Sequence, residues 1–293
     1  MLIIKKYEVA PERHIIIILY GVAGTGKTSL ANTSKNPILI DFEKGYDRAS
    51  NRVDTIVATK WTDITDELES IKNYDTVIVD TCKSAIDDYL AAYVVERDYK
   101  LQKNALKRFG AMGDEFKLFV NQLRNSNSDI VLVCHDKETV EGDIIRHSPD
   151  CTGQSKDLIV RIADQVGYMY MDNGKRVVNF APTDTTIGKD TAQLGRVDVP
   201  NVADAKYDTF MADIISSTKK AIQSKSEAQK EAYAKLEDAR NKLESVKTAK
   251  DANDMIAVAN GLAQIHQRGF KTMMMAALKE KGFDFKDGKF VKE

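Results

Sequence analysis

The run Ile15-Ile16-Ile17-Ile18-Leu19-Tyr20-Gly21-Val22-Ala23-Gly24-Thr25-Gly26-Lys27-Thr28 decides the fold of this 293-residue chain. Its first half is apolar and predicts a buried strand over 14–20 with both faces covered, as in the interior of a parallel sheet. Its second half is rich in glycine and leads into a helix that we expect to begin near Lys27. Glycines let backbone N–H groups turn inward around phosphate oxygens, and the helix N-terminus adds the positive end of its dipole. We therefore expect a binding site for nucleotide phosphates at this turn.

The spacing Gly21-x-x-x-x-Gly26-Lys27-Thr28 matches the phosphate-loop (P-loop) pattern in the context that the pattern requires, a strand before it and a helix after it. Lys27 is expected to reach the β- and γ-phosphates, and the hydroxyl of Thr28 is expected to ligate Mg²⁺. We predict ATP and Mg²⁺ as cofactors and hydrolysis of ATP to ADP and phosphate as the reaction. The predicted nucleotide-binding residues are Gly21, Val22, Ala23, Gly24, Thr25, Gly26, Lys27, Thr28 and Ser29.

The rest of the segment 1–218 alternates short β-branched runs with helical stretches. This alternation predicts βαβ units around a mainly parallel sheet. The stretches 138–146 and 166–180 predict antiparallel hairpins that turn at Gly142 and Gly174. We therefore expect an α/β fold whose mainly parallel central sheet is extended by antiparallel hairpins. The expected strands are 37–41, 54–58, 75–80 and 129–135, and the expected helices are 62–71, capped by Thr62, 84–97 and 112–125.

Two carboxylates are predicted to serve the phosphate site. Asp80 ends an apolar strand about 50 residues after the P-loop and is the candidate for holding Mg²⁺ together with Thr28. Glu43 follows the strand 37–41 and is the candidate for polarising the attacking water. If that strand neighbours the P-loop strand, Glu43 emerges at the same carboxyl edge of the sheet, where ligands bind. Asp41 is the rival for this catalytic role.

His135 is the third catalytic candidate, beside Lys27 and Glu43. It ends the strand after that of Asp80, so its polar tip is expected at the carboxyl edge, where it contacts the γ-phosphate. The competing interpretation is a core histidine with satisfied hydrogen bonds. A zinc site built from Cys134 and His135 is disfavoured, because adjacent strand residues point to opposite faces.

The composition changes after about residue 218. The segment 219–293 carries 16 Lys and Arg against 11 Asp and Glu, a net charge of +5, whereas the whole chain has −1. Leu236, Ala239, Leu243 and Val246 have the spacing of a helical seam, and a second amphipathic helix is expected over 252–281. We predict a core domain 1–218 and a helical hairpin in the appendage 219–293, which closes with a small β-hairpin turning at 287–288.

The whole chain has an ordinary globular composition, with 43% hydrophobic and 30% charged residues. Its three cysteines include no CxxC pair, which favours a reduced, cytoplasmic setting. No apolar stretch approaches the roughly 20 residues that a membrane span needs. The start, residues 1–6, lacks the long apolar region of a signal peptide.

Four segments together resemble the ATPase core of RecA-like proteins. They are the P-loop, Leu39-Ile40-Asp41-Phe42-Glu43, Val77-Ile78-Val79-Asp80 and Val131-Leu132-Val133-Cys134-His135. Over roughly 10–215 the chain is similar to phage-encoded RecA-fold proteins, including short RecA-like single-strand annealing proteins. The resemblance implies that Glu43 is the catalytic glutamate and His135 the γ-phosphate sensor, and it places the chain in the host-cell cytoplasm if a phage encodes it.

The resemblance also implies two loops that bind single-stranded DNA, at about 97–112 and 136–157. The first combines cations with Tyr99 and Phe109, a composition that suits phosphates and stacked bases. The competing interpretation is a solvated helix face. In the second, the acidic Glu138, Glu141 and Asp143 weaken the case. The predicted nucleic-acid residues are Arg97, Lys100, Lys103, Lys107 and Arg108.

RecA-like ATPases place their site between subunits, so the resemblance implies a homo-oligomer with a cation donated by a neighbouring subunit. Lys156, Arg176 and Lys189 are the candidates. The leading function is an Mg²⁺-dependent ATPase acting on single-stranded DNA in phage recombination or annealing. The alternative is a loader or regulator with little turnover, whose tail binds a single-strand-binding, replication or packaging protein. A small-molecule kinase is a third possibility, but no arginine-rich lid is evident.

Overall fold

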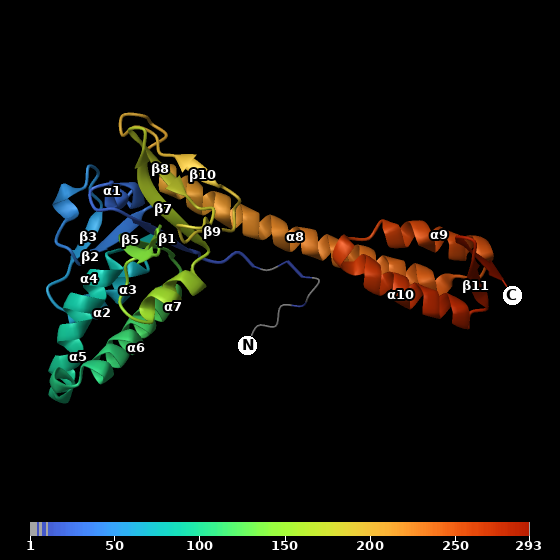
Figure 1. The fold of residues 1–293 in the computed structure, drawn as a ribbon, viewed down its shortest axis with the longest axis horizontal. Helices are drawn as coiled ribbons and strands as arrows, with labels where there is room; N and C mark the ends of the chain where they lie inside the picture. Colours follow the sequence, from blue (N-terminus) through green and yellow to red (C-terminus); the bar gives the residue numbers. More distant parts are fainter. Residues whose placement is uncertain (1–4, 6–7, 10, 293) are drawn as a thin grey trace. The chain divides into compact units, whose positions relative to one another are not determined.

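The computed structural model describes residues 5, 8–9 and 11–292 (Figure 1). The chain divides into two compact units, one of Glu12–Ile222 and one that contains Gln223–Glu293. Most of the stretch considered for a signal peptide lies outside the described residues. Within the described residues, no helix is long and apolar enough to cross a membrane.

The first unit is built on a mixed sheet in which six neighbouring strands, β7, β1, β5, β4, β2 and β3, run parallel. Its order is β10-β8-β7-β1-β5-β4-β2-β3, with β6 paired to β5 and β9 paired to β7. The strands β8 and β10 are antiparallel to their neighbours. The α/β fold with a mainly parallel sheet and antiparallel extensions is therefore confirmed. The strands are β1 (Ile16–Gly21), β2 (Pro37–Asp41), β3 (Asp54–Val57), β4 (Thr76–Asp80), β5 (Asp129–Glu141), β6 (Ile144–Pro149), β7 (Gln165–Asp172), β8 (Lys175–Asn179), β9 (Lys189–Asp190) and β10 (Arg196–Asp198).

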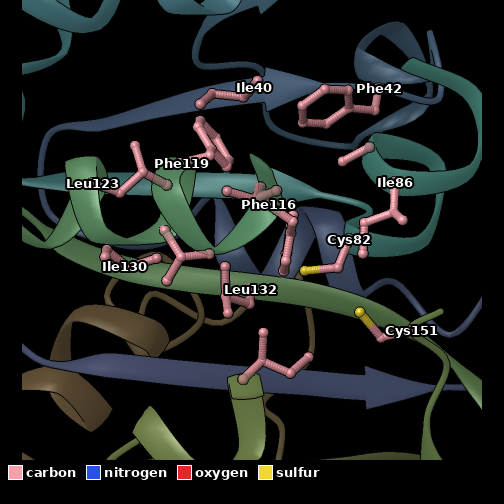
Figure 2. Packing of buried hydrophobic residues seen from close by; sticks show 14 of the residues in the cluster. Ile40, Phe42, Cys82, Ile86, Phe116, Phe119, Leu123, Ile130, Leu132 and Cys151 are labelled. Carbon is pink, nitrogen blue, oxygen red and sulfur yellow. The ribbon is translucent and has the colours of Figure 1, made fainter. Parts of the chain in front are cut away.

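Helices cover both faces of this sheet, which explains why its inner strands are apolar throughout. Ile16 and Ile18 of β1 pack in one layer, on the side of α6, whereas Ile17 packs in the other layer with Leu30 of α1. Figure 2 shows the first layer, where Phe116 of α6 lies against the strand that carries Leu132. The helical segments are α1 (Lys27–Ala31), η1 (Tyr46–Arg48), α2 (Trp61–Asp66), α3 (Leu68–Ile71), α4 (Cys82–Ser84), η2 (Ala85–Leu90), α5 (Ala91–Arg97), η3 (Tyr99–Lys103), α6 (Ala105–Arg124) and α7 (Ser155–Ile162).

Two helix predictions are wrong in detail. The helix expected over 62–71 is two short helices, and Thr62 does not cap it. Instead the Asp63 carboxylate accepts hydrogen bonds from the backbone N–H groups of Thr59 and Lys60, which fixes the start of α2 one residue earlier. The helix expected to begin at 112 begins at Ala105, because the Asn104 side chain accepts a hydrogen bond from the Lys107 N–H and caps it.

Both antiparallel hairpins are confirmed. The register of β5 and β6 pairs Glu141 with Ile144 and leaves Gly142-Asp143 as a two-residue turn. The second hairpin joins β7 to β8 through Asn173 and Gly174, whose φ angles of 49° and 78° are those of a left-handed turn. The strand expected over 129–135 does not stop at His135. It continues to Glu141, so one strand forms both the sheet interior and the first arm of a hairpin.

The tail unit has a small hydrophobic core of its own, in which all four predicted seam residues are buried. The second helix, expected over 252–281, is two helices, because the chain leaves the helix at Gly261 and re-enters it at Gln264. The helical hairpin is therefore corrected to three helical segments. The closing β-hairpin is confirmed, and Asn253 exchanges two hydrogen bonds of 2.8 Å with the backbone of Phe290. The tail elements are α8 (Phe210–Ser245, whose first turns belong to the other unit), α9 (Ala249–Asn260), α10 (Gln264–Glu280), β11 (Phe283–Lys286) and β12 (Lys289–Lys292).

Candidate nucleotide site

The P-loop connects β1 to α1 with backbone that only glycine tolerates. A Cβ at Gly21 would lie 2.1 Å from the carbonyl oxygen of Met169 on the neighbouring strand. Gly24 and Gly26 have φ angles of 79° and 91°, and nothing lies within 4 Å of the place where a Cβ of Gly24 would be. The loop is therefore closely packed on the sheet side at Gly21 and open at Gly24. Such a glycine-rich concavity at the end of a strand fits phosphate groups.

Lys27 lies inside this loop with only 5% of its surface exposed. Its Nζ donates hydrogen bonds of 2.9 Å to the carbonyl oxygens of Gly21 and Val22. Burial lowers the pKa of the Lys27 ammonium, and the nearby carboxylates of Asp80 and Glu43 oppose that effect. A buried cation that has only carbonyl oxygens as partners is well suited to exchange them for phosphate oxygens.

Thr28 and Asp80 lie side by side, as the predicted metal site requires. The hydroxyl of Thr28 donates a hydrogen bond of 2.5 Å to Oδ2 of Asp80. Burial is the main reason why the pKa of Asp80 is raised to about 6, and the negative charges of Glu43 and Asp41 add to it. A buried carboxylate surrounded by other carboxylates gains from a cation, so these residues fit Mg²⁺.

Glu43 and His135 form a hydrogen-bonded pair. His135 Nε2 lies 2.8 Å from Oε1 of Glu43, and the Thr81 hydroxyl donates to the same oxygen at 2.8 Å. The hydrogen bond with His135 is the largest cause that lowers the pKa of Glu43 to about 2. Glu43 is therefore ionised throughout the neutral range. The histidine is not a core residue, because a third of its side chain is exposed.

Asp41, the rival of Glu43, is placed differently. It is buried, and its carboxylate accepts hydrogen bonds from the backbone N–H groups of Glu43, Gly45 and Tyr46. Both of its oxygens are thus used to fold the loop that carries Glu43. This arrangement favours Glu43 as the group that faces a ligand and gives Asp41 a positioning role.

The condition stated for Glu43 is not met, yet the residue lies at the site. Its strand β2 does not neighbour β1, because β4 and β5 lie between them. The strands β1, β5, β4 and β2 are all parallel, so their carboxyl ends reach the same edge of the sheet. The side chains of Glu43, Asp80 and His135 therefore come together at this edge. A cavity of about 280 Å³ opens at this edge, lined by P-loop residues and by Glu43, Asp80, His135 and Arg48.

Two arginines of the same chain lie at or beside this cavity: Arg48, which was not predicted, and Arg176, which was predicted only as a cation donated to a neighbouring subunit. Arg48 lines it, and its charge contributes to the low pKa of Glu43. The Arg176 guanidinium lies 3.6 Å from the Cβ position of Gly26, so this candidate for donation between subunits lies beside its own P-loop. Lys189 donates hydrogen bonds to the carbonyls of Arg161 and Ala163, and Lys156 lies 3.4 Å from the Ser148 hydroxyl. No local motif marks Arg48 or Arg176, since sheet order and loop folding bring them there.

The predicted nucleic-acid residues lie elsewhere, at the end of α5, on η3 and at the start of α6. The segment is helical rather than a loop. The Arg97 guanidinium forms an ion pair with Glu115 and packs over the Tyr93 ring, so it already has partners within the protein. Lys100, Lys103 and Lys107 are exposed. The Arg108 guanidinium lies 6.0 Å from the Phe109 ring centre.

These observations agree with what comparison with known proteins finds. No curated protein sequence matches the chain significantly. Residues 13–192, which include the whole phosphate edge of the sheet, match a family described as an AAA domain, whose members are P-loop NTPases. Because this match covers more than half of the chain, the protein belongs to the AAA domain family of P-loop NTPases.

Proposed function

We propose that the protein hydrolyses ATP with Mg²⁺ at the phosphate edge, and that Lys27, Thr28, Asp80, Glu43 and His135 are the residues responsible. One observation carries the proposal: these side chains, from four separate segments, surround one cavity of about 280 Å³. In this proposal Lys27 binds the terminal phosphates. Thr28 and Asp80 hold Mg²⁺, which neutralises charge that develops on the phosphates.

The pKa of Glu43 refines its role. A carboxylate with a pKa of about 2 is a weak proton acceptor at neutral pH, but it is a permanent hydrogen-bond acceptor. We infer that Glu43 orients and polarises the attacking water rather than holding its proton. His135 and Thr81 fix the carboxylate by binding one of its oxygens. A γ-phosphate that attracts the His135 imidazole would loosen this pair, which is consistent with a sensing role for His135.

We further propose single-stranded DNA as the partner, in recombination or annealing as the RecA resemblance implies. A second cavity, of about 530 Å³, supports this proposal because it joins the two predicted DNA-binding segments: Arg108 and Phe109 from the first, and Lys137 from the second. Lys83 also lines it, but that ammonium pairs with Asp150 at 2.9 Å. The exposed Lys137 and the half-buried Arg108, beside the half-exposed Phe109 ring, suit the phosphates and bases of a single strand.

ATP turnover with and without single-stranded DNA tests the DNA proposal. Replacing Lys103, Lys107 and Arg108 with alanine should weaken DNA binding and flatten its salt dependence, because fewer counterions are released. A matched variant removes three exposed tail lysines: Lys230, Lys235 and Lys271. Equal affinity and equal salt dependence in the first variant would refute the assignment. If only the second variant loses affinity for single-stranded DNA, the DNA-binding site lies on the tail.

The alternative function is a nucleotide-dependent loader or regulator that binds a replication or packaging protein and turns over slowly. It is favoured if DNA neither binds nor accelerates hydrolysis while ATP still binds. The proposed homo-oligomer, with ATP between subunits, is tested by sedimentation with and without nucleotide. A monomer under both conditions would leave Arg48 and Arg176 of the same chain as the cations for the phosphate edge.

A further inference from the structure

A second cluster of ligand-type side chains lies on the β5–β6 hairpin, outside the nucleotide cavity. Asp136 and Glu138 are two residues apart on β5, so they share one face of the strand. The register pairs Glu138 with His147 of β6, which brings the imidazole to the same face. One ligand atom from each of the three side chains lies within 4.8 Å of the others.

Asp136 is the residue that points to a missing ligand. Its side chain is 3% exposed, and its Oδ1 is buried without a hydrogen-bond partner in the described part of the chain. Its Oδ2 is used fully, with His147 Nδ1 at 2.6 Å and the Tyr168 hydroxyl at 3.4 Å. A buried carboxylate oxygen without a partner is costly, and such a group commonly marks a water or ion that completes it.

The His147 imidazole is held in place independently of the two carboxylates. The backbone N–H of His147 donates to the Thr185 carbonyl at 2.7 Å, and its carbonyl accepts from the Ile187 N–H at 3.3 Å. The ring stacks on that of Tyr168, with 5.0 Å between centroids. Glu138 is exposed at the mouth of the cluster and makes no hydrogen bond or ion pair with any described residue. Asp136 and His147 are thus held in place before a metal binds, whereas the exposed Glu138 carboxylate can move toward them.

We propose that Asp136, Glu138 and His147 bind a divalent transition-metal ion with the ligand preference of Zn²⁺. One imidazole nitrogen and two carboxylate oxygens are ligands that Zn²⁺ accepts, and three protein ligands leave a position for water. Zinc bonds of about 2.0–2.2 Å in tetrahedral geometry place ligand atoms about 3.3 Å apart. His147 Nδ1 and Asp136 Oδ2, which lie 2.6 Å apart, therefore separate slightly, and the Glu138 carboxylate closes in. The metal would take the place of the contact between His147 and Asp136 and join β6 to β5.

This site also gives a reason for the acidic residues that weakened the second predicted DNA-binding loop. Glu138 belongs to the cluster. Glu141 does not belong to it, because its carboxylate is paired with Arg146. The cluster lies on the strand that carries His135, so a metal would steady the hairpin that continues from the phosphate edge. The competing explanation is that the hydrogen bonds among Asp136, His147 and Tyr168 are purely structural.

The test is a titration of the full-length, nucleotide-free protein with Co²⁺ and then Zn²⁺, in excess Mg²⁺ to occupy the phosphate edge. We expect one equivalent of Co²⁺ with weak visible bands, displaced by Zn²⁺. Glu138→Gln, an exposed and isosteric change that leaves folding intact, should lower Zn²⁺ affinity at least about tenfold. His147→Gln should lower it further. Asp143→Asn, which removes a carboxylate from the same hairpin turn, is the matched control and should bind like the wild type.

Three outcomes would overturn the proposal. The first is the absence of binding. The second is a Glu138→Gln protein with wild-type affinity. The third is an intense near-ultraviolet band from thiolate-to-cobalt charge transfer, which would move the metal to the buried Cys82, Cys134 and Cys151.

Discussion

Strand β5 contributes one member to each of two histidine–carboxylate pairs, His135 to the first and Asp136 to the second, and the two pairs differ in what they face. At the phosphate edge, His135 lies 2.8 Å from Glu43, and about a third of each side chain is exposed to the cavity. On the hairpin, His147 lies 2.6 Å from Asp136, whose side chain is buried. His135 and Asp136 are adjacent in the chain, so they point to opposite faces of the strand.

The difference shows how surroundings assign chemistry to the same pair of groups. The Glu43 carboxylate keeps one oxygen open to the cavity and has its pKa lowered to about 2, so it presents a fixed negative charge to a ligand. Asp136 has one oxygen buried without a partner, so it is incomplete as it stands. The first pair can act on a ligand that enters and leaves, whereas the second is suited to retaining an ion.

Lys27→Ala is expected to have the largest effect, because it removes the buried cation of the P-loop while leaving the hairpin pair intact. ATP hydrolysis should fall by at least about 10³-fold, the upper scale for loss of one group that stabilises developing charge. ATP binding should also weaken. Steady-state phosphate release and nucleotide titration measure both effects. Normal turnover by folded Lys27→Ala protein would contradict the assignment of the P-loop.

Glu43→Gln should keep ATP binding and slow hydrolysis by about 10²-fold, the typical scale for a positioned catalytic group. The glutamine retains the hydrogen bond with His135 but loses the charge that polarises water. Single-turnover hydrolysis separates this effect from product release. Asp41→Asn is the comparison: if it hydrolyses more slowly than Glu43→Gln with intact binding, the two residues exchange roles.

Asp80 differs from Glu43 and Asp136 because its buried carboxylate has no histidine partner, and Asp80→Asn tests the effect of that difference. Because burial raises the pKa of Asp80 to about 6, the folded protein holds this proton more tightly than the unfolded chain does, and stability is lost as the pH rises from about 4, the ordinary pKa of Asp, to 6. In chelator, Asp80→Asn should therefore increase the free energy of unfolding by about 2 kcal/mol at pH 8, and by about half as much at pH 5. Denaturant unfolding at both pH values measures this. A variant that is less stable at pH 8 would contradict the burial argument.

His135→Gln should have a smaller effect, concentrated at low pH. Removing the imidazole removes the largest cause that lowers the pKa of Glu43, so protonation of Glu43 begins at a higher pH than in the wild type. We expect hydrolysis to be at most about twofold slower near pH 5, and a smaller loss near pH 8. A pH–rate profile measures the shift, and a parallel loss at all pH values would show that His135 acts by another route.

Truncation should have the smallest effect, because both pairs lie within Glu12–Ile222. We propose that chains ending at 218 or at 222 still bind ATP. The shorter chain loses Lys219, whose ammonium pairs with Asp129 at 2.8 Å, so it should be less stable by about 1 kcal/mol. Thermal unfolding and nucleotide titration of both chains test this. Failure of both to bind ATP would show that the tail belongs to the catalytic domain.

Much of the fold could be predicted because its signals are local. Consecutive β-branched residues mark β1 and β4, and paired turn residues mark both hairpins. Helix boundaries were less predictable, since Asp63 and Asn104 act as caps without an unusual local composition. The break at Gly261 divides an amphipathic pattern that continues on both sides, so periodicity alone gave one helix instead of two.

The sequence by itself determined the P-loop and the buried strands that end near Lys27, Glu43 and Asp80, because each follows from the pattern of a short segment. The strand order that brings Glu43 to the phosphate edge was decided by the tertiary structure. Only the tertiary structure decided that His135 binds Glu43, which lies 92 positions away, and that Asp41 is used to fold a loop. The same holds for the cluster of Asp136, Glu138 and His147. Its members meet because the two-residue turn fixes the register of β5 and β6, and a shift of one residue would turn the His147 imidazole to the opposite face.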